Sequence, residues 1–595
     1  MQPTIEILGK ISENSRNNKE EIFTRLYRYM LRPDLYYLAY KNLYANQGAA
    51  TKGVNDDIAD GFSEKKINKI IQSLADESYS PSPVRRTYIQ KKNSTKKRPL
   101  GIPTFTDKLV QEVLRMILEA VYEPVFSHYS HGFRPRRSCH TALNSLKKEF
   151  TAVTWFIEGD IKGCFDNINH HILVNIINAK IKDARLIQLI WKLLKAGYME
   201  DWKYHNTYSG CPQGGICSPI LANIYLNELD KFAKKTAEEF FSPRPQDRTT
   251  EYTQLNGLIQ RLKSRVSTAT GQDKVDLLKR IKELRAQLRK TPCTARTDKV
   301  IKYIRYADDF IIGVKGNRTD CERIKHQFAE FISQRLNMEL SAEKTLITHS
   351  SQHARFLGYD IRVRRDDKVK QNGNHLARTL NNKIELRIPN ADKIMPFLFS
   401  KRAFRQLQDG TIEPIARAYF YSCTDLEIVS IYNSELRGIC NYYSIASNFC
   451  DLHYFAYLME YSCLKTLAGK HNVTSRKIIN KYRDGTGKWS IPYKTAKWEK
   501  RRAFANFRDC KTAGRCDDII FNSAMRHTGT STTFESRLAA QVCELCGKTG
   551  VSLEMHHVNK VKNLKGKTQW ELVMIAKKRK TLAVCKDCHH KIHHP

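Results

Sequence analysis

The sequence lacks any long hydrophobic run: no stretch of about 18 apolar residues occurs in its 595 residues. Residues 1–19 are polar and lack the basic and apolar regions of a secretory signal. Paired cysteines are also lacking before about residue 541, since most of the 16 cysteines stand singly, as reduced thiols do. We therefore expect no membrane span and no secretion, and we expect a cytoplasmic protein.

Acidic residues are scarce relative to basic ones. The chain has 100 Lys and Arg against 61 Asp and Glu, a formal net charge of +39. Such an excess predicts a polyanionic partner, with nucleic acid as the first candidate and an anionic membrane surface as the second. At 41% hydrophobic and 10% aromatic residues the chain can still bury sizeable cores, which excludes a wholly disordered protein. Its length predicts three to five domains.

Two apolar segments place carboxylates at strand ends. The run at residues 155–160 ends in Asp160, and two runs within residues 300–314 flank Asp308 and Asp309, which is the pattern of a strand, a tight turn and a strand. Two-metal phosphodiester chemistry needs carboxylates that bridge ions about 3.5–4 Å apart, and a metal relieves the repulsion between neighbouring acids. Ordinary turn-forming aspartates are the alternative, and the tetrapeptide at residues 306–309 alone leaves it open.

Seven segments in order resemble the sequence blocks of reverse transcriptases. They are residues 98–103, 132–135, 159–166, 212–215, 306–309, 343–345 and 356–359. The resemblance covers about residues 85–362, and chance does not plausibly supply seven blocks in the right order. It implies a multi-domain α+β protein built as a right-hand polymerase, with fingers, a palm that holds an antiparallel sheet, and a helical thumb.

The same resemblance implies roles for individual residues. Asp160, Asp308 and Asp309 would hold two Mg²⁺ ions. Phe165 would stack under the nucleotide sugar and exclude a 2′-hydroxyl, so that dNTPs are preferred, although a core phenylalanine is the alternative.

Four further side chains are expected at the nucleotide. Arg98, with Lys91 or Lys92, would clamp the triphosphate, the arginine as a bidentate donor. For the two lysines a solvated or RNA-contacting role is equally open. Gln213 would contact the nucleotide, and Lys344 could donate a proton to the departing pyrophosphate.

The flanking regions indicate which kind of reverse transcriptase this is. The N-terminal extension, a charged helical hairpin predicted within residues 231–299, and residues 436–443 resemble bacterial group II intron-encoded proteins of the lactococcal type. The resemblance implies a maturase region in which Arg437, Tyr442, Tyr443 and Tyr461 suit RNA contacts, with a thumb-helix core as the alternative for the tyrosines. The basic and aromatic residues 470–508 suggest a DNA-binding segment, with a solvated linker as the alternative.

The last fifty-odd residues carry two CxxC pairs with the spacing of a tetrahedral Zn²⁺ site. These cysteines are Cys543, Cys546, Cys585 and Cys588. Among them lie histidines that resemble those of an HNH endonuclease, a ββα-metal fold around one divalent ion. A purely structural zinc module that binds DNA is the alternative.

The HNH resemblance implies that His557 is the general base and that His556, His589 and His593 ligate the ion. Lys580 stands where HNH sequences usually carry an asparagine. Whether Asn559 or Asn563 supplies the missing amide is left open.

We therefore predict a group II intron-encoded protein that binds its intron RNA and promotes splicing, nicks target DNA, and extends the nicked end with dNTPs by target-primed reverse transcription. Its domains are expected at residues 1–84 (N-terminal extension and first fingers helices), 85–389 (fingers and palm, with the insertion at 231–299), 390–480 (maturase or thumb), 481–540 (DNA binding) and 541–595 (HNH). The protein would associate with the nucleoid when bound to DNA and with no membrane.

Two other functions compete with this prediction. An RNA chaperone with vestigial polymerase blocks would have lost Asp160, Asp308 or Asp309, and all three are present. A host-defence reverse transcriptase would lack the maturase-like and HNH-like regions. The sequence does not identify the intron, the DNA target, the nicking metal or the oligomeric state, for which a homodimer is one option.

Overall fold

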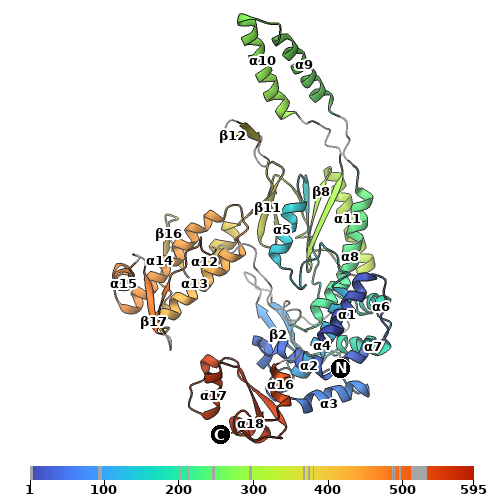
Figure 1. The fold of residues 1–595 in the computed structure, drawn as a ribbon, viewed down its shortest axis with the longest axis vertical. Coiled ribbons are helices and arrows are strands. Elements are labelled where there is room, and N and C mark those ends of the chain that lie inside the picture. Colours follow the sequence, from blue (N-terminus) through green and yellow to red (C-terminus); the bar gives the residue numbers. More distant parts are fainter. Residues whose placement is uncertain are drawn as a thin grey trace.

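The computed structural model describes residues 4–90, 97–201, 203–207, 209–210, 214–243, 248–291, 293, 298–365, 369–372, 375–378, 381–485, 487, 489–494, 498–510 and 533–594. Within these ranges the chain is an elongated assembly of helices and small antiparallel sheets (Figure 1). No helix of the described part is long and apolar enough to cross a membrane. Lys91, Lys92 and Gln213 lie outside the described residues.

The N-terminal part is helical, as the sequence predicts. α1 (Thr4–Asn17) and α2 (Pro33–Leu43) pack against α4 (Phe105–Tyr122), which is buried along almost its whole length. α3 (Glu64–Ala75) begins at Ser63, whose side chain accepts a hydrogen bond from the Lys66 amide. The basic hairpin expected near residue 90 is present: β2 (Val84–Gln90) and β3 (Lys97–Ile102) are antiparallel. They join β5 (Tyr198–Glu200) and β6 (Lys203–His205) in one sheet.

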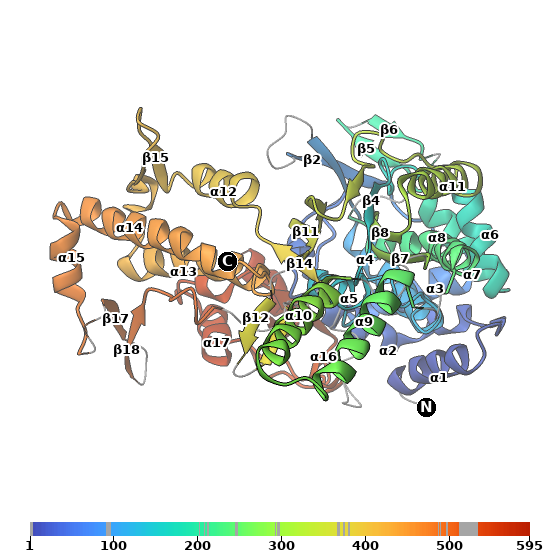
Figure 2. The ribbon, with the colours of Figure 1, turned by 90° about the horizontal axis from the view of Figure 1, so that it is seen from above.

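A four-stranded antiparallel sheet forms the centre of the molecule. Its order is β7 (Val300–Tyr306), β8 (Asp309–Lys315), β4 (Trp155–Asp160) and β9 (Ile347–His349). Alternate residues along a strand point to opposite faces. Accordingly, Phe156 and Ile311 join the hydrophobic core that contains α5 (Cys139–Glu149), whereas Ile157 and Ile312 join the core that contains α8 (Ser218–Phe240) and α11 (Arg318–Leu336). Both faces are therefore covered by helices (Figure 2).

The thumb region continues the core on the α5 side of the sheet. Its helices are α13 (Asp425–Tyr442), α14 (Leu452–His471) and α15 (Ser475–Tyr482), and the hairpin of β17 (Ser490–Lys494) and β18 (Glu499–Ala503) packs on α13.

Further helices and strands connect these parts. They are α6 (His170–Lys180), α7 (Ala184–Leu194), β10 (Ala354–Phe356), β11 (Tyr359–Val363), β12 (Val369–Asn372), β13 (His375–Arg378), β14 (Ile384–Arg387), α12 (Met395–Ser400), β15 (Phe404–Gln406) and β16 (Ile412–Pro414).

The C-terminal residues form a ββα unit that packs on the N-terminal helices. β19 (Leu553–His557) and β20 (Thr581–Cys585) are antiparallel and precede α18 (Lys586–His593). α16 (Thr533–Ala539) contacts α2, α17 (Gln569–Lys577) lies between the two strands in sequence, and β1 (Phe62–Ser63) extends the sheet at β19. Apolar residues of this unit belong to the same hydrophobic core as those of the N-terminal helices, and Figure 1 shows the unit beside these helices.

The predicted charged hairpin projects away from the sheet (Figure 1). α9 (Thr250–Val266) and α10 (Gly271–Lys290) pack on each other through a core of their own: Ile259, Ile281 and Leu284 are its buried members. At its base, Ser242 and Lys299 exchange backbone hydrogen bonds of 3.0 and 3.1 Å. The chain thus leaves and re-enters the palm at one closed point.

Because the hairpin contributes no side chain to the main cores, replacing residues 244–297 by a short Gly/Ser turn should leave the fold intact. The melting temperature should change by less than about 4 °C, and extension of a primed generic template should stay within a few-fold of wild type. Thermal unfolding and a primer-extension assay test this. A loss of both stability and extension would show that the hairpin supports the palm.

Candidate active sites

Three carboxylates meet at one end of the central sheet. Asp160 ends β4 and is the register partner of Asp309, the first residue of β8. Asp308 lies in the turn between β7 and β8, where Ala307 adopts a φ of 56°. The three aspartates that the sequence singled out are therefore brought together by strand pairing.

The electrostatics of this cluster favour cations. Burial raises the pKa of Asp309, and the neighbouring Asp308 and Asp160 raise it further, to about 7. Burial also raises the pKa of Asp308, against the opposing charges of Lys344 and Arg98. Lys344 Nζ lies 2.7 Å from Asp160 Oδ2, a hydrogen bond that raises the pKa of the lysine. Desolvated carboxylates that repel one another are a suitable set of oxygen ligands for divalent cations.

A fully buried ion pair holds the carboxylate turn in place. Arg305 on β7 lies 2.7 Å from Asp230 Oδ2 on α8, and neither side chain is exposed. Arg305 also donates hydrogen bonds to the Ala307 carbonyl at 2.8 Å and to Ser130 Oγ at 2.8 Å. This pair was not predicted from the sequence, although an arginine between Ile304 and Tyr306 in a largely apolar strand is a signal that could have found it.

The loop before α5 presses directly on the same turn. A Cβ on Gly132 would lie 2.3 Å from the Ala307 amide nitrogen, so no larger residue fits there. Asn223 on α8 donates a hydrogen bond of 2.9 Å to the Gly132 carbonyl. Gly132 belongs to one of the reverse transcriptase-like blocks, and its role here is close backbone approach.

Among the described side chains expected at the nucleotide, Arg98 and Lys344 act electrostatically on the carboxylates. Phe165 is half-buried and packs edge-to-face on Phe133, with ring centroids 5.9 Å apart. Arg98 is exposed on β3, and its charge reaches Asp308. Gly214 has a φ of +108°, and a Cβ on it would lie 2.6 Å from the Gly101 carbonyl. The loop that follows Gln213 thus sits against the fingers hairpin.

The maturase-region tyrosines divide into two groups. Tyr442 and Tyr443 donate hydrogen bonds to the carbonyls of Leu357 and Gly358, and so they brace the last of the seven blocks. Tyr461, in contrast, is exposed and ends a row of three tyrosines on α14. The ring centroids of Tyr454 and Tyr457 are 6.3 Å apart, and those of Tyr457 and Tyr461 are 4.5 Å apart. Arg437 is exposed on α13.

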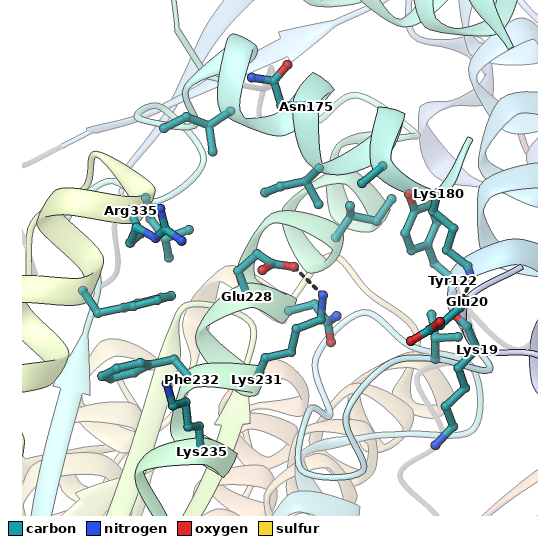
Figure 3. Close-up of a pocket in the computed structure, with 18 of the residues that line it drawn as sticks. Lys19, Glu20, Tyr122, Asn175, Lys180, Glu228, Lys231, Phe232, Lys235 and Arg335 are labelled. Atoms are coloured by element: carbon teal, nitrogen blue, oxygen red, sulfur yellow. Dashed lines mark hydrogen bonds and ion pairs between the residues drawn. The ribbon is translucent and has the colours of Figure 1, made fainter. Parts of the chain in front are cut away.

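A basic groove runs between α6, α8 and the end of α11 (Figure 3). Its lining includes five cationic side chains: Lys19, Lys180, Lys231, Lys235 and Arg335. Tyr122 and Phe232 add aromatic surface, and Glu228 forms an ion pair of 2.7 Å with Lys231. Positive charge combined with aromatic rings is typical of a surface that binds a nucleic-acid backbone.

The segment expected to bind DNA is partly described. Trp489 is buried and donates a hydrogen bond of 2.9 Å to Glu460, so it belongs to the thumb core. Trp498 is 71% exposed. Arg501 hydrogen-bonds Ser490 within the β17–β18 hairpin, and residues 511–532 lie outside the described residues.

The four cysteines of the tail form one cluster. Their sulfur atoms all lie within 4.8 Å of one another, in the order Cys543, Cys546, Cys585 and Cys588. Burial opposes ionisation of Cys543, but backbone amides of Cys546, Cys585 and Leu545 point at its sulfur and lower its pKa to about 6. A thiolate favoured by surrounding amides is suited to a soft divalent cation.

The histidines of the tail separate onto two sides of β19. His556, His589 and His593 converge on the carboxylate of Asp60, and the four ligand atoms lie within 4.8 Å of one another. His557 lies apart from this group: its Nε2 is 2.9 Å from the Tyr44 carbonyl, and burial lowers its pKa. Burial alone would lower the pKa of His589 too, but hydrogen bonds to Asp60 and Glu554 raise it to about 9.

Fold and sites together define a polymerase of the reverse transcriptase class joined to an endonuclease unit. Residues 89–249 and 278–361 match the family model for reverse transcriptase (RNA-dependent DNA polymerase). Residues 381–513 match type II intron maturase, and residues 543–589 match the AI2M/AI1M-like HNH endonuclease. The predicted fold class and enzyme class are confirmed.

Comparison with whole proteins shows the family. The group II intron-encoded protein LtrA of Lactococcus lactis subsp. cremoris is 58% identical over 596 residues, covering 100% of both chains. An uncharacterized 91 kDa protein in a cob intron of Schizosaccharomyces pombe is 35% identical, over 98% of this chain and 72% of that one. The chain belongs to the group II intron-encoded proteins, and it is a reverse transcriptase and maturase with an HNH endonuclease that functions in intron mobility.

One solved structure, an apo telomerase from Candida tropicalis, covers 52% of this chain and 61% of that chain at 16% identity, with a TM-score of 0.30. That similarity is too low to support an argument. The family itself implies binding of intron RNA, of DNA substrates and of dNTPs.

The substitution Asp230→Asn tests whether the buried pair supports the carboxylate turn. Removing one partner leaves Arg305 as an uncompensated buried charge, which should lower the free energy of unfolding by about 3–5 kcal/mol. Primer extension should fall as the turn loosens. Urea unfolding and primer extension are the measurements.

Glu228→Gln is the matched control, because it breaks an exposed ion pair on the same helix. It should change the stability by about 1 kcal/mol or less. Equal stabilities of the two variants would contradict the supporting role of Asp230.

Proposed function

We propose that the three clustered aspartates are the catalytic centre of target-primed reverse transcription. Asp160, Asp308 and Asp309 would hold two Mg²⁺ ions, and the observation that carries this proposal is their convergence through strand pairing in a desolvated site. The ions would supply activation of the primer hydroxyl and neutralisation of the leaving pyrophosphate.

The surrounding side chains would bind and orient the incoming dNTP. Arg98 and Lys91 would hold the triphosphate, and Gln213 would contact the nucleotide. Phe165 would lie against the sugar and exclude a 2′-hydroxyl by volume, which its half-buried position beside Phe133 supports. Lys344, hydrogen-bonded to Asp160, is close enough to the centre to give a proton to the pyrophosphate.

The C-terminal unit would nick the target DNA. His557 would accept the proton of the attacking water: a carbonyl only accepts hydrogen bonds, so the contact with Tyr44 places the proton of His557 on Nε2 and leaves Nδ1 as the acceptor. His556, His589 and His593 would hold one divalent ion, which would supply a positive charge beside the scissile phosphate. Cys543, Cys546, Cys585 and Cys588 would hold a structural Zn²⁺, since four thiolates are its preferred set.

Intron RNA would bind along the basic groove and the tyrosine row of α14, and together with the protein it would form a ribonucleoprotein. Stacking on Tyr454, Tyr457 and Tyr461 suits unpaired bases, and the lysines of the groove suit phosphates. The order of events would be splicing, nicking of the DNA and extension of its 3′ end on the intron template, and the protein would associate with the nucleoid while it is bound to DNA. The five-domain division and the homodimer stay predictions.

Asp308→Asn should abolish cDNA synthesis on a primed template while leaving the affinity for intron RNA within a few-fold of wild type. The substitution removes a metal ligand but keeps the shape of the turn. Primer extension and filter binding of the intron RNA measure the two effects. Asp409→Asn is the control, because Asp409 occupies a hairpin turn remote from the sheet, and it should change neither. Equal loss of both activities would mean that Asp308 is only structural.

His557→Ala should remove nicking of a labelled target duplex by the ribonucleoprotein, because the proton acceptor is lost. Reverse transcription should persist. His590→Ala, on the exposed side of α18, is the control and should nick normally. Cys543→Ala should behave differently and lose zinc, protease resistance and nicking together, since a small domain depends on its metal. Persistent nicking by the His557 variant would refute the assignment.

A further inference from the structure

A segment of the N-terminal region forms one wall of the endonuclease unit. β1 pairs with β19, so that Phe62 faces Met555 and Ser63 faces Glu554. The Gly61 amide donates to the Met555 carbonyl at 3.1 Å, which continues the pairing toward Asp60. Residues almost 500 positions apart in sequence thus belong to one sheet.

Aromatic packing reinforces this interface. Tyr40 stacks on Phe62 with ring centroids 3.9 Å apart. Phe534, on α16, packs edge-to-face on Tyr40 at 5.3 Å and on Tyr44 at 4.9 Å. Phe62 is fully buried, so the interface is part of the protein's core.

Asp60 projects from this wall into the histidine cluster. Its Oδ2 lies 2.7 Å from His593 Nε2 and 3.2 Å from His589 Nε2, and its Oδ1 lies 3.3 Å from His556 Nδ1. Only 11% of its side chain is exposed. Three imidazole nitrogens on two elements therefore point at one desolvated carboxylate that comes from a third.

His556 is buried in this cluster, and its ring nitrogens lack hydrogen bonds of good geometry. Its side chain is 4% exposed, its Nε2 makes no hydrogen bond within the described part of the chain, and its Nδ1 has only the 3.3 Å contact with Asp60. A buried ring nitrogen without a hydrogen bond is costly, so the arrangement calls for a ligand. A cation placed among the four ligand atoms would satisfy His556 and compensate the buried charge of Asp60 together.

A second carboxylate orients one of the histidines. Glu554 lies 2.7 Å from His589 Nδ1, which leaves His589 Nε2 directed at Asp60. A carboxylate that holds the outer nitrogen of a metal-ligating histidine is a recurrent arrangement around bound ions. Glu554 lies two residues before His556 on β19, so this strand supplies both a metal ligand and the group that orients His589.

We propose that Asp60 is the fourth protein ligand of the endonuclease ion, so that the N-terminal region completes the nicking site. This inference rests on the proposed endonuclease function and extends it. Three imidazoles and one carboxylate form a donor set for a borderline transition-metal dication such as Zn²⁺ or Co²⁺, whereas Mg²⁺ prefers oxygen ligands. The N-terminal region also positions His557, through the Tyr44 carbonyl, so the metal and the general base both depend on this region.

Metal content of the full-length protein is the first test. Mild chelation that leaves the four-cysteine site loaded, followed by Zn²⁺ titration, should restore a second zinc ion in the wild type. Asp60→Asn should weaken this second site by more than the roughly 10–100-fold that loss of an outer partner costs. Asp60→Glu, which keeps the carboxylate, should recover part of the affinity. Asp56→Asn alters an exposed acid of the same loop and should bind as wild type does. Unchanged zinc affinity in Asp60→Asn would overturn the proposal.

Hydrogen exchange gives a readout that is independent of activity. Zn²⁺ should slow exchange of the amides in residues 60–63 and 553–557 of the wild type, because the ion fastens the two segments together. Asp60→Asn should lose this metal-dependent protection while its metal-free exchange pattern stays like that of the wild type. Protection that is equal in both proteins would refute ligation by Asp60.

Nicking separates the proposal from its main competitor, a carboxylate that blocks the site until DNA arrives. Ligation predicts that Asp60→Asn loses nicking and keeps primer extension, whereas a blocking role predicts faster nicking, which would overturn the proposal. The His557→Ala variant decides the endonuclease assignment separately. If that variant still nicks DNA while Asp60→Asn loses its second zinc, the assignment of His557 as the general base is wrong and the metal site stands.

Discussion

Arg305 and Asp230 form a fully buried ion pair beneath the carboxylate turn, and the polymerase site depends on it. Arg305 joins the turn to α8, and through Ser130 to the loop that carries Gly132. The three aspartates repel one another, and the hydrogen bond from Arg305 to the Ala307 carbonyl holds their turn closed against that repulsion. A rigid arginine with several donors is suited to this task, because it satisfies a carboxylate, a hydroxyl and a carbonyl at once.

The contact between the two ends of the chain has a similar logic. A ββα unit of this size has little core of its own, and here it gains one by merging with the N-terminal helices. The unit therefore depends on the N-terminal region, because β1 extends its sheet and Asp60 joins its histidine cluster. The N-terminal region and the endonuclease unit are therefore connected through one sheet and one core.

Much of this architecture was predictable from the sequence. Alternating apolar residues around Asp160 and Asp309 specify the strands, and the paired CxxC motifs specify the cysteine cluster. What escaped prediction was long-range: Asp230 and Asp60 are unremarkable acids on a helix and in a loop, and only the packing of distant elements gives them partners. Tyr442 and Tyr443 were open between RNA contact and core, and their hydrogen bonds to the 357–358 backbone favour the core.

The three clusters differ in the chemistry of their donor atoms, and this difference can keep their ions apart. The first cluster, in the palm, offers carboxylate oxygens, and the second, in the tail, offers four thiolates. The third is a mixed set of imidazole nitrogens and one carboxylate. Hard Mg²⁺ favours the first, whereas Zn²⁺, a borderline ion, suits both the four thiolates and the mixed set. Mg²⁺ competes poorly for imidazoles, so with the proposed ligand set nicking and polymerisation would differ in their metal requirement. Asp60 would adjust this difference, since its single negative charge would raise the affinity for a dication without making every ligand an oxygen.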